Sequence, residues 1–353
     1  MKVLEPLGLE VVFHADWWKQ NYGFDFGPDF YFDPDTRVSA ERRMNRILSE
    51  RFPGLTISDT RDQDEPIIGP LHFACGYLIP SALGCEVRFH SDAPPEVQTL
   101  NMSEDEIMKL EVPELTDTPL IRKTIEMMDI LEGKFGYIVG DVGWDGLQNT
   151  ALYLRGQELF IDYMMNPSLV DRLLSVIYET QVKFVNLIRN RTGTSSISIN
   201  RDILKANPRL NVHSNCSLVM VSPEIYEKYL LPFEKRLASS LAPYGIHHCG
   251  NRMETKAALF GKVEGLEYVD IGYGSDLRLC RQVLPDQIFS IRLSPVELEK
   301  MNPDEVIREV KRLVKAAGDF EKQVVCCINM SHKVPDENIF AIQEAINQLK
   351  KEG

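Results

Sequence analysis

Short apolar runs alternate with longer amphipathic segments from about residue 135 onward. The runs are rich in β-branched and aromatic residues and have the length of buried strands. They occupy residues 135–142, 210–216, 245–249, 267–273, 288–293 and 324–329. Two further strands are expected near residues 55–58 and 85–91.

The amphipathic segments carry clear helix signals. Asn166-Pro167 places an N-cap residue before proline, and the apolar positions then repeat at helical spacing as far as Gly193. Further helices are expected to start at Ser222-Pro223 and Asn302-Pro303, and a last one covers residues 335–351. Strands that alternate with helices in this way favour a parallel sheet with right-handed crossovers.

The number of expected strands comes close to eight, which favours a closed (β/α)8 TIM barrel in the α/β class. An open doubly wound sheet with a dinucleotide site is less favoured, because no G-x-G-x-x-G turn follows any expected strand. No Pro/Gly linker divides the chain. We therefore expect one barrel domain over residues 51–353.

Residues 1–50 differ from the rest of the chain. They hold Trp17, Trp18 and many Phe and Tyr residues, broken by glycine and proline. This composition is typical neither of a regular helix nor of a strand. We expect an N-terminal extension packed on the barrel, either as a lid over the pocket or as a plug at its other end.

Composition narrows the class of partner. The net charge is −13 and the pI is about 5.1, whereas nucleic-acid binding needs a basic surface, so no nucleic-acid partner is expected. No apolar run approaches the ~20 residues of a membrane-spanning helix, and the first residues lack a signal peptide. The prediction is a cytoplasmic protein with no membrane partner.

Polar side chains gather at the predicted strand ends, where barrel enzymes place their active sites. Each is a potential ligand or catalytic group: Asp141, Asp145, His213, Cys216, His247, His248, Cys249, Asp270, Asp276, Cys326, Cys327 and His332. A competing interpretation is that the cysteines are ordinary buried core residues. The convergence of several strand ends on one pole favours a metal site.

Strand geometry selects among these residues. His247 and Cys249 stand at i and i+2 and so face the same side, whereas His248 faces the helices. Cys326 and Cys327 point in opposite directions, so only one of them can face the barrel. Two cysteines and one histidine would hold zinc and leave its fourth position open, as in a catalytic site. Such a zinc ion can lower the pKa of a substrate thiol or hydroxyl.

Five segments together resemble the uroporphyrinogen decarboxylase superfamily. They lie at residues 146–179, 220–241, 246–251, 270–285 and 333–346. The resemblance implies a (β/α)8 barrel. It also implies one of two activities: decarboxylation of porphyrinogens, or methyl transfer with a corrinoid protein.

The two branches differ in their motifs. The decarboxylases carry an N-terminal stretch whose arginines hold tetrapyrrole carboxylates, and this chain has no arginine before Arg37. The methylcobamide:coenzyme M methyltransferases carry H-x-C followed by a second cysteine 70–80 residues later. His247-x-Cys249 is similar to the first part, and Cys326 lies 77 positions beyond Cys249. Counting back from Pro335 favours Cys327 instead, so both stay open.

The resemblance thus implies a zinc-dependent methyltransferase. It would work with a corrinoid, either free cobalamin or cobalamin on a partner protein, and with a small-molecule methyl donor or acceptor. His247, Cys249 and Cys326 or Cys327 would bind zinc. Asp141, Asp270 and Asp276 are candidates for the open metal position or for proton transfer. The candidate corrinoid-binding and pocket residues are His213, Asn215, Trp17 and Trp18. The alternatives are a tetrapyrrole decarboxylase without metal and a non-catalytic corrinoid- or porphyrin-binding barrel.

Overall fold

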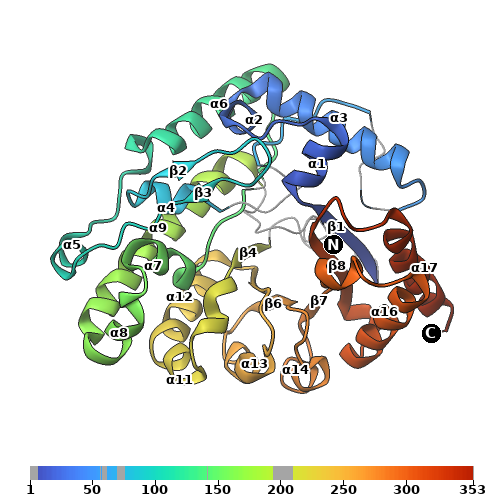
Figure 1. The fold of residues 1–353 in the computed structure, drawn as a ribbon. Coiled ribbons are helices and arrows are strands. Elements are labelled where there is room, and N and C mark those ends of the chain that lie inside the picture. The colour runs from blue at the N-terminus through green and yellow to red at the C-terminus, as the bar shows by residue number, and fades with distance from the viewer. Residues whose placement is uncertain are drawn as a thin grey trace.

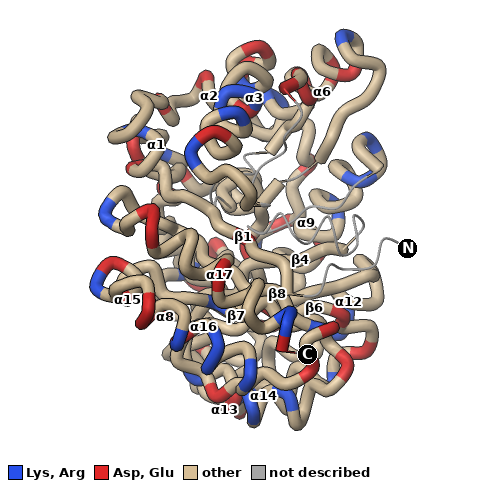
Figure 2. The backbone as a smooth tube through the Cα atoms, turned by 90° about the vertical axis from the view of Figure 1, so that its right-hand side faces the viewer, with Lys and Arg blue, Asp and Glu red and all other residues tan. Residues whose placement is uncertain are grey.

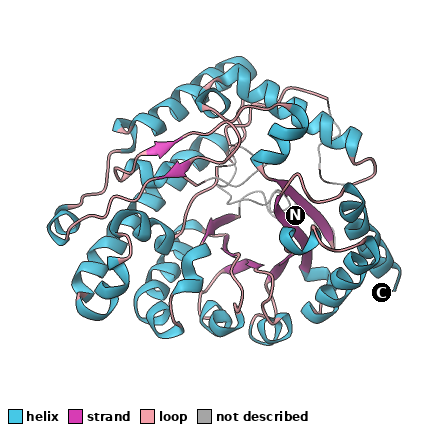
Figure 3. Ribbon diagram, viewed as in Figure 1, coloured by secondary structure: helices cyan, strands magenta, loops and turns pink. Residues whose placement is uncertain are grey.

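A curved parallel sheet surrounded by helices forms the centre of the protein (Figure 1 and Figure 3). The computed structural model describes residues 7–55, 57, 62–69, 76–140, 142–193 and 210–352. Six parallel strands pair in the order β1-β8-β7-β6-β5-β4. Their bounds are β1 Gly8–Phe13, β4 Asn211–Ser214, β5 Tyr244–His248, β6 Leu266–Ile271, β7 Ile288–Arg292 and β8 Gln323–Met330. The fold is of the (β/α)8 TIM-barrel class, as predicted.

The predicted strands from residue 210 onward are confirmed, while those before it differ. Residues 135–142 were expected to form a strand, but α6 runs to Phe135 and only Val139 pairs, in a single parallel bridge with Ile67. Few apolar residues stand between Gly136, which caps α6 with positive φ, and Gly140. The run is therefore too short for a regular buried strand.

The prediction of a barrel strand at residues 85–91 was wrong. Its place is taken by a separate antiparallel pair, β2 (Val87–Arg88) and β3 (Glu96–Val97). Pro94 and Pro95 lie between the two strands, and proline favours a reversal of the chain over a continued ladder. The strand expected at 55–58 falls partly outside the described residues.

Helices cover the outside of the sheet (Figure 1). The predicted starts are confirmed at α9, which has Asn166 as N-cap and Gly193 as C-cap, and at α16, where Asn302 and Glu305 form a capping box. Ser222 caps α11 as predicted, and a π-helical turn at Tyr226–Leu230 leads into α12. The bounds are α1 Ala15–Tyr22, α2 Pro28–Phe32, α3 Pro34–Arg51, α4 Leu78–Ala82, α5 Glu104–Lys109, α6 Pro119–Phe135, α7 Leu147–Arg155, α8 Glu158–Met165, α9 Pro167–Thr192, α11 Pro223–Ile225, α12 Leu231–Leu241, α13 Glu254–Phe260, α14 Leu277–Val283, α15 Pro295–Leu298, α16 Pro303–Ala317 and α17 Asp336–Glu352.

The N-terminal segment is more regular than the sequence suggested. β1 pairs in parallel with β8 at the edge of the sheet, with Gly8 opposite Val324 and Val11 opposite Cys327. The helices α1, α2 and α3 follow it. The prediction that this segment is neither helix nor strand was wrong, because its apolar run Val11–Phe13 finds its partner strand near the other end of the chain.

Basic and acidic side chains are interspersed along the outer helices (Figure 2). Figure 2 shows no extended stripe of a single sign on this side of the molecule. Among the described helices, none is both long and apolar enough to cross a bilayer.

Candidate metal centre

Three potential metal ligands meet where two neighbouring strands end. His247 is near the end of β5, Cys249 directly follows that strand, and Cys216 begins the 3₁₀ turn after β4. The register places Ser214 of β4 opposite His247. One ligand atom from each of Cys216, His247 and Cys249 lies within 4.8 Å of the others. Donors around a tetrahedral zinc ion are separated by about 3.3–3.8 Å, so a small closure would bring these three to zinc distances.

A buried polar network holds the turn that carries Cys216. The Asn215 backbone N–H donates to the His247 carbonyl at 2.8 Å, which ties the turn to β5. The Asn215 side chain donates to His213 and to Glu234, and the Tyr244 hydroxyl contacts His213 Nδ1 at 2.8 Å. His213 and Asn215 are fully buried and do not line the pocket. The structure therefore does not bring these two predicted cofactor-binding residues to the pocket, and they belong instead to the buried network that holds the Cys216 turn.

Asp270 fixes the orientation of the His247 ring. His247 donates from Nδ1 to the Asp270 carboxylate, which also accepts a hydrogen bond from the Tyr268 hydroxyl at 3.1 Å. His247 Nε2 is buried without a partner. Burial alone would lower the pKa of His247, but the Asp270 carboxylate outweighs it and raises this pKa to about 9. A histidine held by a carboxylate with its second nitrogen free is the usual arrangement of a metal ligand.

The thiols of Cys216 and Cys249 differ in pKa. Cys216 donates a hydrogen bond toward Cys249, which lowers the pKa of Cys249 and raises that of Cys216. His247 and the Arg292 guanidinium lower the pKa of Cys249 further. Thiolates are the metal-binding form of cysteine, so Cys249 is the thiol of this group that is best suited to bind a cation.

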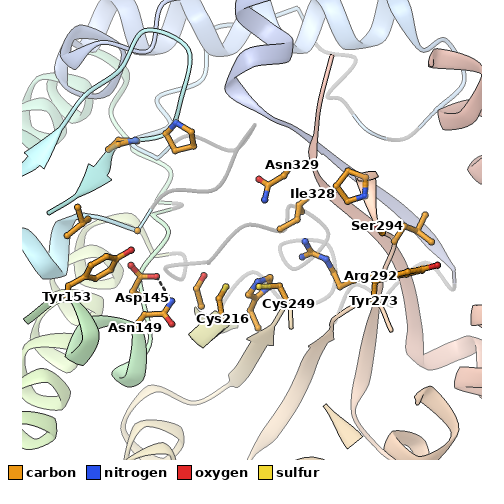
Figure 4. A pocket seen from close by; sticks show the side chains of 18 residues that line it. Asp145, Asn149, Tyr153, Cys216, Cys249, Tyr273, Arg292, Ser294, Ile328 and Asn329 are labelled. Atoms are coloured by element: carbon orange, nitrogen blue, oxygen red, sulfur yellow. Dashed lines mark hydrogen bonds between the residues drawn. The ribbon is translucent and has the colours of Figure 1, made fainter. Parts of the chain in front are cut away.

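The centre opens into a pocket of about 540 Å³. Figure 4 shows Asp145 and Asn149 on one side of the two cysteines and Arg292 and Ser294 on the other. Burial raises the pKa of Asp145 to about 7, although Asn149 donates to its carboxylate at 3.0 Å. The walls include Pro94, Pro95, Val97, Leu293 and Ile328. The volume is that of a small-molecule site.

The structure places the two β8 cysteines outside this group. Cys326 and Cys327 are fully buried, and burial raises the pKa of both thiols. Cys327 Sγ lies 3.8 Å from the Leu293 carbonyl, and Cys326 is paired in register with Arg292, further down β8 than the pocket-lining Ile328 and Asn329. Neither thiol joins the three clustered ligands. The third potential ligand is instead Cys216, in the turn that follows β4.

The other predicted residues have different positions. Asp276 is exposed and serves as the N-cap of α14, accepting from the backbone N–H groups of Arg278 and Leu279. Trp17 and Trp18 are buried in an aromatic cluster and do not line the pocket. Asp141 lies outside the described residues.

Two pocket residues received no role from the sequence alone. Asp145 is predicted only as a strand-end carboxylate, and the sequence pattern assigns no role to Arg292. The available signal for Arg292 was a charged residue closing the otherwise apolar run at residues 288–293. A charge at the carboxyl end of a barrel strand points into the active-site pole more often than a charge elsewhere.

The fold and the site together define a barrel protein with a thiolate and imidazole centre at the carboxyl ends of its strands. The sequence model described as Uroporphyrinogen decarboxylase (URO-D) matches residues 71–349, and the chain belongs to that family. No curated protein matches the chain.

Solved structures agree with this fold. A methyltransferase from Methanosarcina mazei is similar with a TM-score of 0.69 and 16% identity, over 98% of this chain and 95% of the other. A B12-independent methionine synthase from Shewanella sp. W3-18-1, solved in complex with selenomethionine, is similar with a TM-score of 0.50 and 10% identity, over 98% of both chains.

Proposed function

We propose that this protein is a zinc-dependent methyltransferase that moves a methyl group between a corrinoid and a small molecule. The single observation that carries this proposal is the Cys216, His247 and Cys249 group at the floor of the pocket. Membership of the URO-D family and the likeness to a methyltransferase of the same fold support it. The methyl-bearing or methyl-accepting atom of the small molecule would be a thiol sulfur, a phenol or methyl ether oxygen, or an amine nitrogen.

The donor set fits zinc. Two thiolates and one imidazole suit this ion, and three protein ligands leave a fourth position for substrate. Cys249 is exposed, so that position would open toward the pocket. When bound, zinc would lower the pKa of the substrate heteroatom and hold it as the anion.

The surrounding residues have separate tasks in this proposal. Asp270 would keep His247 in the tautomer that offers Nε2 to the metal. Asp145, held by Asn149, is the carboxyl group of the pocket wall and would take up or return the proton of the substrate heteroatom. For a thiol acceptor, its sulfur would attack the methyl carbon, the cobalt–carbon bond would break, and the electron pair would stay on cobalt.

The pocket cannot enclose a corrin ring together with a substrate, because about 540 Å³ is the size of a single small-molecule site. The corrinoid would therefore approach from the rim, as free cobalamin or on a partner protein. The small molecule would reach the metal centre from inside the pocket.

A tetrapyrrole decarboxylase is the less favoured alternative. Such a substrate carries several carboxylates, and Arg292 is the one Lys or Arg side chain among the described pocket-lining residues. Arg37 is fully buried, paired with Glu41 and placed over the Phe30 ring, so it serves the core. A non-catalytic corrinoid-binding barrel would be favoured by corrinoid binding without methyl exchange.

Metal analysis of matched variants tests the centre first. Wild type purified without chelator is expected to hold about one zinc ion per chain, as a three-ligand site does. Cys216→Ser and Cys249→Ser should each lose most of it, while the control Cys326→Ser keeps it. Retention of zinc in Cys216→Ser together with loss in Cys326→Ser would contradict the ligand set.

Methyl exchange tests the activity. Zinc-loaded protein is mixed with methylcobalamin and a panel of thiols, phenols and amines, and the cobalamin absorption spectrum reports demethylation. We expect turnover with at least one acceptor, and a loss of more than about 100-fold in Cys249→Ser. A zinc-loaded protein that binds cobalamin and exchanges no methyl group in either direction would contradict the proposal.

A further inference from the structure

Arg292 is a buried cation, two of whose nitrogen atoms make no hydrogen bond within the described part of the chain. It ends β7 and lines the pocket, and only 5% of the residue is exposed. Nε and Nη1 are both buried and unpartnered. Among the described residues the Asp270 carboxylate is paired with Arg292, but Asp270 Oδ2 lies 3.8 Å from Nη1, which is beyond hydrogen-bond distance.

Burying an arginine with unpartnered donors costs folding free energy when no ligand is bound. A buried donor that makes no hydrogen bond keeps the full penalty of losing water, and the penalty is larger for a charged group. Arginine carries five N–H donors in a rigid planar fork. The fold therefore presents donors that the described part of the chain leaves unused.

The groups packed around Arg292 explain why no acceptor among the described residues takes these donors. Asp270 is engaged by His247, Tyr268 and Ser290. The Cys249, Cys326 and Cys327 sulfurs are weak acceptors, and Cys249 is needed at the metal. The remaining side of the guanidinium faces the pocket, beside Ile328 and Asn329 in Figure 4.

We infer that Arg292 binds a carboxylate group of the substrate whose heteroatom reaches the Cys216, His247 and Cys249 centre. This inference rests on the proposed methyl transfer and names the substrate class for it. A carboxylate matches the planar fork of arginine, and the pairing is strongest where water is excluded. The substrate would be a small carboxylic acid that carries its thiol, ether or amine within reach of the metal.

The opposite wall sets the orientation of this substrate. Asp145 stands across the two cysteines from Arg292, so a carboxylate placed at that end would meet another carboxyl group (Figure 4). Arg292 is the one Lys or Arg side chain of the described lining, and the other basic residue there, His247, is engaged by Asp270 and assigned to the metal, so the pocket accommodates a single anionic group at Arg292. A substrate with several carboxylates is rejected by the same argument.

A pair of thiols that differ only at the far end tests the assignment. Binding of 3-mercaptopropionate and of the neutral 3-mercaptopropan-1-ol is measured by titration calorimetry on zinc-loaded wild type, Arg292→Gln and Arg292→Lys. The wild type is expected to bind the carboxylate at least ten-fold more tightly than the alcohol. Arg292→Gln should lose about 10- to 100-fold for the carboxylate and little for the alcohol, and Arg292→Lys should lose less.

Zinc content measured on the same samples separates this inference from the proposed function. Equal affinity of the wild type for both thiols, equal weakening of both in Arg292→Gln, or no binding of either thiol to zinc-loaded protein would overturn the role of Arg292. In each case the bound zinc would leave the metal centre standing. Absence of zinc from every sample would contradict the proposed function. Even then, the carboxylate site would be supported if the wild type prefers the carboxylate and Arg292→Gln loses that preference.

Discussion

Two regions of this protein attracted a functional interpretation from sequence, and they have different fates. The ends of β4 and β5 assemble Cys216, His247 and Cys249 at the floor of a pocket. The aromatic N-terminal segment, which was expected to form a lid or a plug, packs Trp17 and Trp18 into the core. The first region presents polar side chains to a pocket, and the second buries aromatic side chains in the core.

The difference follows from what each kind of side chain gains by burial. A thiolate or imidazole at a strand end needs a partner, and it finds one across the neighbouring strand or in a ligand. Trp17 gains by leaving water, and its ring lies 4.1 Å from that of Phe13 and 4.7 Å from that of Trp18. Clustered aromatic residues therefore indicate a core first and a binding surface only when they remain exposed.

The largest expected effect on this comparison comes from Trp17→Ala. Removing the buried ring leaves a cavity among Phe13, Trp18 and Phe52, and should lower the free energy of unfolding by about 3–5 kcal/mol. Urea denaturation measures it. Trp17→Phe, which refills most of the space, is the control and should cost less. A folded Trp17→Ala protein that retains full stability and loses only its substrate affinity would contradict the core role and indicate that this segment takes part in substrate binding.

A smaller effect is expected from Asp270→Asn, which removes the carboxylate behind His247 and keeps its shape. Loss of such an outer partner typically weakens metal binding by about 10–100-fold. Competition with a chromophoric zinc chelator measures the affinity. Asp276→Asn is the matched control, because asparagine also caps helices and this residue lies outside the pocket. Equal zinc affinity in the two variants would contradict a role of Asp270 in zinc binding.

The smallest effect is expected from Asp16→Asn, at the junction between α1 and the end of β8. Asp16 accepts from His14 at 2.7 Å and from His332 at 2.5 Å. Burial alone would raise the pKa of Asp16, but these histidines outweigh it and lower the pKa below 3.8. The contact is partly exposed, so the loss of stability should stay near or below about 1 kcal/mol.

The pH dependence of that loss follows from its sign. A carboxyl group with a depressed folded pKa stabilises the protein above its unfolded pKa of about 4, and this contribution disappears as the pH falls through the folded value. Denaturation of wild type and Asp16→Asn at several pH values should show a gap at pH 5 that closes toward pH 3. A gap that widens in acid would contradict this role. Zinc content should be unchanged in the variant.

The sequence predicted most of the second half of the chain, because strand length, helical spacing and caps such as Asn302 are local signals. β1 was missed because its partner, β8, lies more than three hundred positions away, and no local pattern reveals such a pairing. The His247 and Cys249 pair follows from strand alternation alone. The choice between Cys216 and the β8 cysteines needs the register of β4 against β5, which the chain order does not contain. Arg292 was missed because an arginine ending a strand acquires meaning only once its neighbours are known.

The pairing of β1 with β8 also sets a time order for folding. Gly8 leaves the ribosome 316 positions before its partner Val324, since 324 minus 8 is 316. At about 5–20 residues per second, the edge of β1 waits roughly 15–60 s for its partner. Ile328 and Asn329, which line the pocket, are made after that partner begins. The substrate pocket is thus among the last parts of the molecule to be completed. Until β8 is synthesised, the partly formed sheet has an unpaired edge that other chains can join.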